Sequence, residues 1–70
     1  MAESTYKVIE IVGSSSESWE RAAASAVEQV SKSVRDLRVA EVVTLDMSLE
    51  GGKVVAYRAK LKVSFKFEGT

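Results

Sequence analysis

The sequence has no cysteine and no histidine. Disulfide bonds are therefore excluded, and so are the commonest pair of metal-binding side chains and the commonest general base. The serines cluster where a helix is expected to start, and helix capping accounts for them there. We therefore expect a protein that is not an enzyme.

Net charge and long apolar runs are also missing. Lys and Arg number 10 and are balanced by 10 Asp and Glu residues, which argues against a general nucleic-acid binder. No run approaches the length that a transmembrane helix needs, and Met1–Tyr6 has no apolar signal core. We expect a cytoplasmic protein that binds neither nucleic acid nor membranes.

The chain is short for its apolar content. Its 70 residues allow a single domain, residues 1–70, and 46% of them are hydrophobic. A chain of this size buries only about 60% of its unfolded surface, so its own core is marginal. Without disulfides, oligomerisation is the remaining common way to stabilise it. The composition predicts subunit interfaces.

The most regular pattern is in Val54–Phe67. Apolar residues alternate with polar ones there, from Tyr57 with Arg58 onward. Strict alternation indicates a β-strand with one buried face. The run is much longer than the usual strand of about 5–6 residues, so it must curve around something. The helix predicted between Ser15 and Leu37 is the only other element large enough to be wrapped.

That helix carries one apolar stripe at intervals of three and four residues. The stripe consists of Trp19, Ala23, Ala26, Val27, Val30, Val34 and Leu37. Ser15 is the expected N-cap, with Ser14 and Glu17 as an alternative capping box. Before it, Tyr6–Val12 is predicted as a strand with apolar residues on both faces, one of which another subunit would cover.

Arg38–Glu50 is the expected second strand. Its odd positions from residue 39 would share one face, with Glu41 as the exception. A three-residue loop, Gly51–Lys53, is preferred to the two-residue loop Gly51–Gly52 because it keeps apolar side chains opposite each other. It places Asp46 opposite Arg58. The predicted fold class is α+β, in the order β-α-β-β, with a three-stranded antiparallel sheet wrapped around one helix.

The order, length and spacing of these elements resemble those of the dodecins. The residues that carry the resemblance are Tyr6–Gly13 (YKVIEIVG), Glu41-Val42, Lys62-Val63 and Phe65. It extends from about Tyr6 to Glu68. Membership would imply the β-α-β-β fold, a hollow homododecamer with tetrahedral symmetry, and ligand sites at subunit junctions.

Most dodecins bind flavins between tryptophans, and this sequence departs from them at that site. The family tryptophan falls at Val39, its aromatic neighbour at Ala40 and the flavin-binding glutamine at Arg58. Valine offers no flat π surface, and arginine has no acceptor. The comparison predicts that the flavin site is lost. Asp46 is expected to pair with Arg58, the alternative being a ligand-binding pair at the former flavin site.

Several of the departures resemble the calcium-dodecin branch of that family. They include Trp19-Glu20, Asp46-Met47 and Tyr57-Arg58. Calcium needs several oxygen ligands, which copies around a symmetry axis can supply. Glu10 and Glu41 are the candidate metal ligands because each interrupts an apolar strand face. Pairing of each with a lysine or arginine is the alternative, and we favour it.

The predicted function is therefore a non-catalytic homododecamer that binds or stores a small ligand, with calcium favoured. The alternatives are a flavin-binding dodecin and a structural shell without ligand. Trp19 is expected to serve packing in the core or at an interface.

Overall fold

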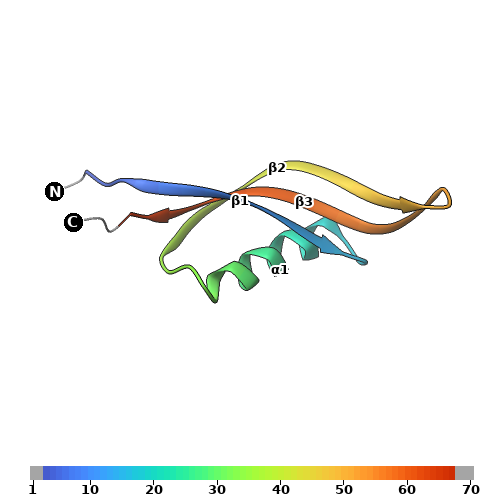
Figure 1. The fold of residues 1–70 in the computed structure, drawn as a ribbon, viewed down its shortest axis with the longest axis horizontal. Coiled ribbons are helices and arrows are strands. Elements are labelled where there is room, and N and C mark those ends of the chain that lie inside the picture. The colour runs from blue at the N-terminus through green and yellow to red at the C-terminus, as the bar shows by residue number, and fades with distance from the viewer. Residues whose placement is uncertain (1–2, 68–70) are drawn as a thin grey trace.

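The computed structural model describes residues 3–67, and the order of its elements is the predicted one. These are β1 (Tyr6–Ser15), α1 (Trp19–Ser31), β2 (Leu37–Glu50) and β3 (Lys53–Lys66). The three strands form one antiparallel sheet, and α1 lies against one face of it (Figure 1). The expected α+β class is confirmed.

The central strand of the sheet is β3, since the strand order is β1-β3-β2. Its odd residues Ala59, Leu61 and Val63 are buried, as the alternation predicts. They pack with Ala22 and Ala26 of α1, and Ile9 and Ile11 of β1 pack at the edge of this core. The even residues of β3 from Ala56 on lie on the opposite face, which we call the outer face of the sheet.

The helix and β1 meet at Gly13, which is buried. A Cβ atom added there would overlap the carbonyl oxygen of Ala22 and lie 2.7 Å from the Cβ of Ala26. Only glycine fits a contact this close between two backbones. Gly13 and the small residues of α1 thus set how tightly the helix packs on the sheet.

The helix begins later and ends earlier than predicted, because α1 stops at Ser31 and Leu37, expected on the helix stripe, is the first residue of β2. Ser18 is the N-cap, and its side chain accepts a hydrogen bond from the backbone N–H of Arg21. The expected cap, Ser15, is instead the last residue of β1, and its Oγ accepts a hydrogen bond from the Glu17 N–H. The prediction failed because several serines precede the helix and each has the chemistry of a cap.

The hairpin between β2 and β3 also differs from the prediction. Glu50 pairs with Lys53, so the loop is the two-residue Gly51–Gly52, and both glycines have positive φ angles of 58° and 77°. Such angles are typical of the tight turns of hairpins. A bulge at Val55 then shifts the register by one residue. The predicted pairing of Asp46 with Arg58 is therefore confirmed, although the predicted loop is wrong.

A second bulge, at Val43, changes which side chains of β2 face the helix, so the predicted faces of this strand are wrong before residue 43. Val42 pairs with Leu61 and Thr44 with Lys60, which leaves Val43 as the extra residue. Before the bulge, Val42 lies on the helix side of the sheet, and Glu41 lies on the outer face. Glu41 is therefore no exception within an apolar face, because the alternation changes phase at Val43.

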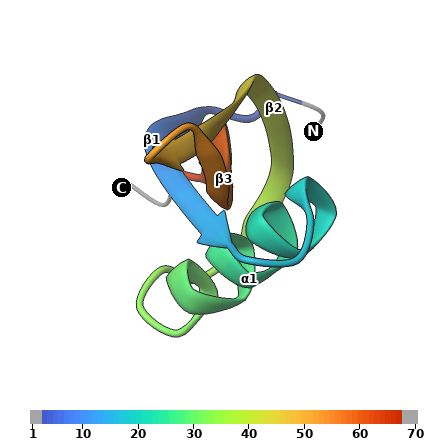
Figure 2. The ribbon, with the colours of Figure 1, turned by 90° about the vertical axis from the view of Figure 1, so that its right-hand side faces the viewer.

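The helix covers only part of the sheet. Its 13 residues span about 20 Å, whereas the 14 residues of β2 span about 46 Å. The hairpin end of β2 and β3 consequently projects past the start of α1 (Figure 1), and Figure 2 views the molecule from that end. The molecule measures 54 × 20 × 15 Å. Within residues 3–67, no helix is long and apolar enough to span a membrane.

Candidate ligand-binding site

Asp46 and Arg58 form a bidentate ion pair across β2 and β3. The Arg58 Nε–H donates to Asp46 Oδ1 at 2.7 Å, and Nη2 donates to Oδ2 at 3.0 Å. The predicted cross-strand pair is thus confirmed. Both side chains are about half exposed, at 46% and 48%. This geometry uses two of the five guanidinium donors and leaves the others for a neighbour or a ligand.

The pair changes the ionisation of both groups. The hydrogen bond from Arg58 lowers the pKa of Asp46, aided by the positive charges of Arg58 and Lys60. The hydrogen bond to Asp46 in turn raises the pKa of Arg58. Both groups are therefore charged at neutral pH, and the outer face carries a fixed ion pair at this point.

The pair is expected to contribute a modest, pH-dependent stabilisation. Because the pKa of Asp46 is lowered on folding, the contribution is present at neutral pH and is lost as the pH falls through that lowered pKa. A double-mutant cycle of Asp46→Asn and Arg58→Gln, followed by urea denaturation, should show favourable coupling at pH 7 and none in strong acid. Absence of coupling at pH 7 would show that solvent screens the pair completely.

Asp46 also connects the sheet to the start of the helix. The Trp19 Nε1–H donates to the backbone carbonyl of Asp46 at 2.9 Å. The Trp19 ring meets Tyr57 edge to face, with centroids 5.1 Å apart and planes at 70°. Trp19 therefore packs as predicted, and it fixes the first turn of α1 to both strands of the hairpin.

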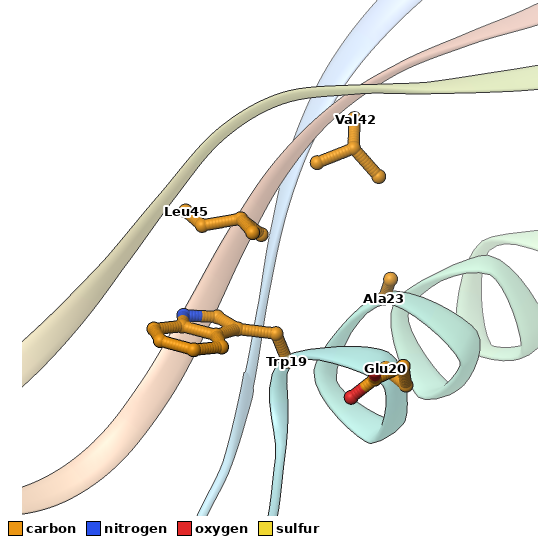
Figure 3. Close-up of a pocket in the computed structure, with 5 residues that line it drawn as sticks. All are labelled: Trp19, Glu20, Ala23, Val42 and Leu45. Carbon is orange, nitrogen blue, oxygen red and sulfur yellow. The ribbon is translucent and has the colours of Figure 1, made fainter.

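A hollow opens beside Trp19, between α1 and β2. It has a volume of about 350 Å³ and is lined by Trp19, Glu20, Ala23, Val42 and Leu45 (Figure 3). A second hollow of about 560 Å³ shares Glu20, Ala23 and Val42 and extends along the helix to Glu28. We call the two together the α1–β2 groove. Its walls are apolar, and its only charged residues are Glu20 and Glu28.

The positions equivalent to the flavin site do not come together within one chain. Val39, Asp46 and Arg58 lie on the outer face, whereas Ala40 lies on the helix side and lines the groove. Val39 pairs with Ser64, six residues from Arg58 along β3, a separation of about 20 Å. A ligand that contacts Val39 and Arg58 together requires residues from more than one copy.

The two candidate metal ligands flank one lysine. Glu10 on β1 and Glu41 on β2 both pair in register with Lys62 on β3. The two carboxylates are thus separated by two strand spacings, about 10 Å, with a positive charge between them. Within residues 3–67, no cluster of three or more acidic residues could hold a metal ion. Their role in binding a metal stays a prediction that depends on assembly.

The groove is the feature that the sequence reasoning missed. Trp19 and Ala23 were placed on the helix stripe, but Val42 was placed on the wrong face of its strand. A signal did exist, because Ala40 and Val42 are apolar residues at alternate positions beside Glu41. In a strand without the bulge at Val43, however, Ala40 and Val42 would share a face with the polar residues Thr44 and Asp46. The apolar pair therefore could not be assigned to the helix side from the sequence.

Comparison with known proteins gives consistent matches along nearly the whole chain. The family model described as Dodecin matches residues 5–68. A curated relative named calcium dodecin, from Mycobacterium tuberculosis, is 52% identical over 63 residues, which cover 90% of this chain and 89% of the relative.

Several solved structures share this fold. The dodecin of Streptomyces coelicolor has a TM-score of 0.91 at 33% identity, with each chain covered completely. A calcium dodecin of M. tuberculosis, described as a calcium-chelating antigen with a novel calcium-binding site, has a TM-score of 0.83 at 49% identity, with 96% of each chain covered.

Proposed function

The chain belongs to the dodecin family, and we propose that it forms a non-catalytic homododecamer that binds a small ligand, with calcium favoured over flavin. The observation that carries this proposal is the match, along nearly the whole chain, to a relative named calcium dodecin. The flavin-site positions support the same choice, since Val39 offers no ring and Arg58 is already paired with Asp46.

Calcium binding would draw its oxygen ligands from several copies. Calcium takes about six to eight oxygen ligands, and the outer face of one chain places two carboxylates, those of Glu10 and Glu41, on either side of Lys62. Copies around a symmetry axis multiply each carboxylate without any change in the chain.

The first test is the mass of the protein in solution. Light scattering should give about twelve times the chain mass of 7.6 kDa. The physical reason is the small core, in which only five hydrophobic residues among those described are buried. A stable folded monomer at micromolar concentration would contradict the proposal.

The second test is calorimetry with calcium, with magnesium as a control, and with flavin. We expect calcium to bind and flavin to bind weakly or not at all. Glu10→Gln and Glu41→Gln should each weaken calcium binding by about tenfold, equal to about 1.4 kcal/mol. Glu50→Gln, at the hairpin turn, is the matched control and should leave it unchanged. Tight flavin binding without calcium binding would favour the flavin-binding alternative, and binding of neither would favour a structural shell.

A further inference from the structure

The hollow beside Trp19 has the size and the lining of a small-molecule site. Its volume is about 350 Å³, and such sites are usually apolar clefts of roughly 300–1,000 Å³ with a few polar groups. In Figure 3, Leu45 lies over the Trp19 ring and Val42 lies opposite Ala23. Glu20 supplies the one charged group of this lining.

Small side chains on the helix leave this space open. The helix packs mainly on β1 and β3, so β2 stands away from it. The helix residues of the lining include Ala23, beside Trp19, and Ala24, further along the α1–β2 groove. Methyl groups at these positions leave the space towards β2 unfilled. The hollow is therefore a consequence of the alanine-rich stripe.

Trp19 is already held in place as one wall of the hollow. Its Nε1–H donates to the backbone carbonyl of Asp46 at 2.9 Å, and its ring meets Tyr57 edge to face. A wall fixed at two points loses little conformational freedom when a ligand binds, which favours affinity. Indole is also the aromatic group that attracts cations most strongly.

The carboxylate of Glu20 belongs to no ion pair among residues 3–67. The ion pairs there join Glu17 to Arg21 and Asp46 to Arg58. Arg21 follows Glu20 directly, and neighbours in the sequence do not face each other on a helix. Glu20 is exposed, so its charge is open to a ligand.

The rest of the lining adds no cation. The β2 side of the hollow consists of Val42 and Leu45. Glu28, in the wider groove, has Lys32 four residues later, at the spacing of neighbours on a helix. The negative charge that a ligand in the hollow meets is therefore that of Glu20.

We propose that the hollow beside Trp19 binds a hydrophobic organic cation, such as an amine joined to an aromatic ring. The ammonium group pairs with Glu20 in a charge-assisted hydrogen bond, and the ring packs against Trp19 and Leu45. Calcium fits this place less well, because it needs about six to eight oxygen ligands and the lining holds one carboxylate. An anion would meet the negative charge of Glu20 with no cation to bind it.

The organic-cation site goes beyond the proposed function and uses a different part of the chain. Glu10 and Glu41, the candidate calcium ligands, lie on the outer face of the sheet, whereas Glu20 lies on the helix side. The two sites can therefore be measured separately on the same protein.

The fluorescence of Trp19, the only tryptophan in the sequence, reports binding at this place. The unmodified, assembled protein is titrated with phenethylamine, which is a cation at neutral pH. Phenethyl alcohol has nearly the same shape without the charge, and phenylacetate carries a negative charge. We expect the amine to change the fluorescence and to bind about tenfold more tightly than the alcohol, and phenylacetate to bind more weakly than either.

Glu20→Gln removes the charge and keeps the shape of the side chain. It should weaken the binding of phenethylamine about tenfold and leave that of phenethyl alcohol unchanged. Glu50→Gln, at the hairpin turn and outside the hollow, is the matched control and should change neither. Calcium binding should be the same in Glu20→Gln as in the unmodified protein.

A second variant fills the hollow. Ala23→Leu places a larger side chain opposite Val42 and should abolish the fluorescence response to both the amine and the alcohol. Ser25→Leu adds the same side chain at an exposed position of α1 outside the lining, and it should leave the response intact.

The outcomes separate the organic-cation site from the proposed function. Equal binding of the amine and the alcohol, or an unchanged affinity for the amine in Glu20→Gln, would overturn the site and leave calcium binding intact. No response of Trp19 to the amine would also overturn it, since the hollow would then be closed to ligands in the assembled protein. A protein that binds the amine but no calcium would contradict the calcium proposal alone.

Discussion

Gly13→Ala is expected to destabilise the protein by about 3 kcal/mol, at the upper end of the usual cost of overpacking a core. The new Cβ would overlap the carbonyl oxygen of Ala22 and crowd the Cβ of Ala26. The first of these is backbone, so no rotamer change can relieve the overlap. A loss of this size is a large share of the about 4–10 kcal/mol expected for a 70-residue chain. Urea denaturation at a fixed protein concentration measures it.

Two further variants give this experiment its controls. Gly52→Ala introduces the same methyl group at a positive φ angle of 77°, where no atom lies within 4 Å. It should cost about 1 kcal/mol, from backbone strain alone. Ala26→Gly, added to Gly13→Ala, removes the side-chain contact but not the backbone one, so it should restore little stability. Full recovery would show that the helix backbone is free to shift away from β1.

The sequence was sufficient for the elements whose patterns are regular. The alternation in β3 predicted the burial of Ala59, Leu61 and Val63, and the structure confirms all three. The spacing of apolar residues predicted a helix between two of the strands. Both patterns follow from fixed geometric periods, so a single misplaced residue changes them little.

The details that failed are those that depend on one residue. Three register shifts, at Arg38, Val43 and Val55, interrupt the pairing of β2 with β3, and each moves the following residues to the opposite face. The loop prediction assumed that β2 and β3 pair without a bulge. Under that assumption, a two-residue turn would place apolar side chains of β2 opposite polar ones of β3, so it was rejected. Gly51-Gly52 was nevertheless the stronger local signal, since both residues need positive φ angles.

The candidate site also has one part that the sequence could predict and one part that it could not. The pairing of Asp46 with Arg58 was predictable because the two residues are opposite each other in register and carry opposite charges. The α1–β2 groove was not, because it arises from the direction in which β2 leaves the helix, and no local pattern encodes that direction. Contacts between copies are even harder to predict from the sequence, because they depend on the shape of the whole chain.

Flavin binding is expected to be at least about 100-fold weaker than in a tryptophan-bearing relative. In the family, tryptophans stack on the flavin at the position of Val39, and aromatic contacts add about 0.5–1.5 kcal/mol each beyond their buried area. Two facing rings would supply about twice that at each site, and each 1.4 kcal/mol is about a tenfold change in affinity. Arg58, moreover, donates to Asp46 and cannot accept a hydrogen bond from the flavin ring.

The double substitution Val39→Trp and Arg58→Gln should restore part of that affinity, measured by quenching of flavin fluorescence. The two positions are about 20 Å apart along β3, so a flavin that meets both must lie between copies, and recovery should appear only in the assembled protein. Val39→Trp alone supplies the ring but keeps the Asp46–Arg58 pair, and it should recover less than the double variant. Val43→Trp adds the same ring four residues further along β2, away from the position of the family tryptophan, and is the matched control. Tight quenching of flavin by the unmodified protein would show instead that another aromatic surface, such as Trp19 with Tyr57, binds the ring.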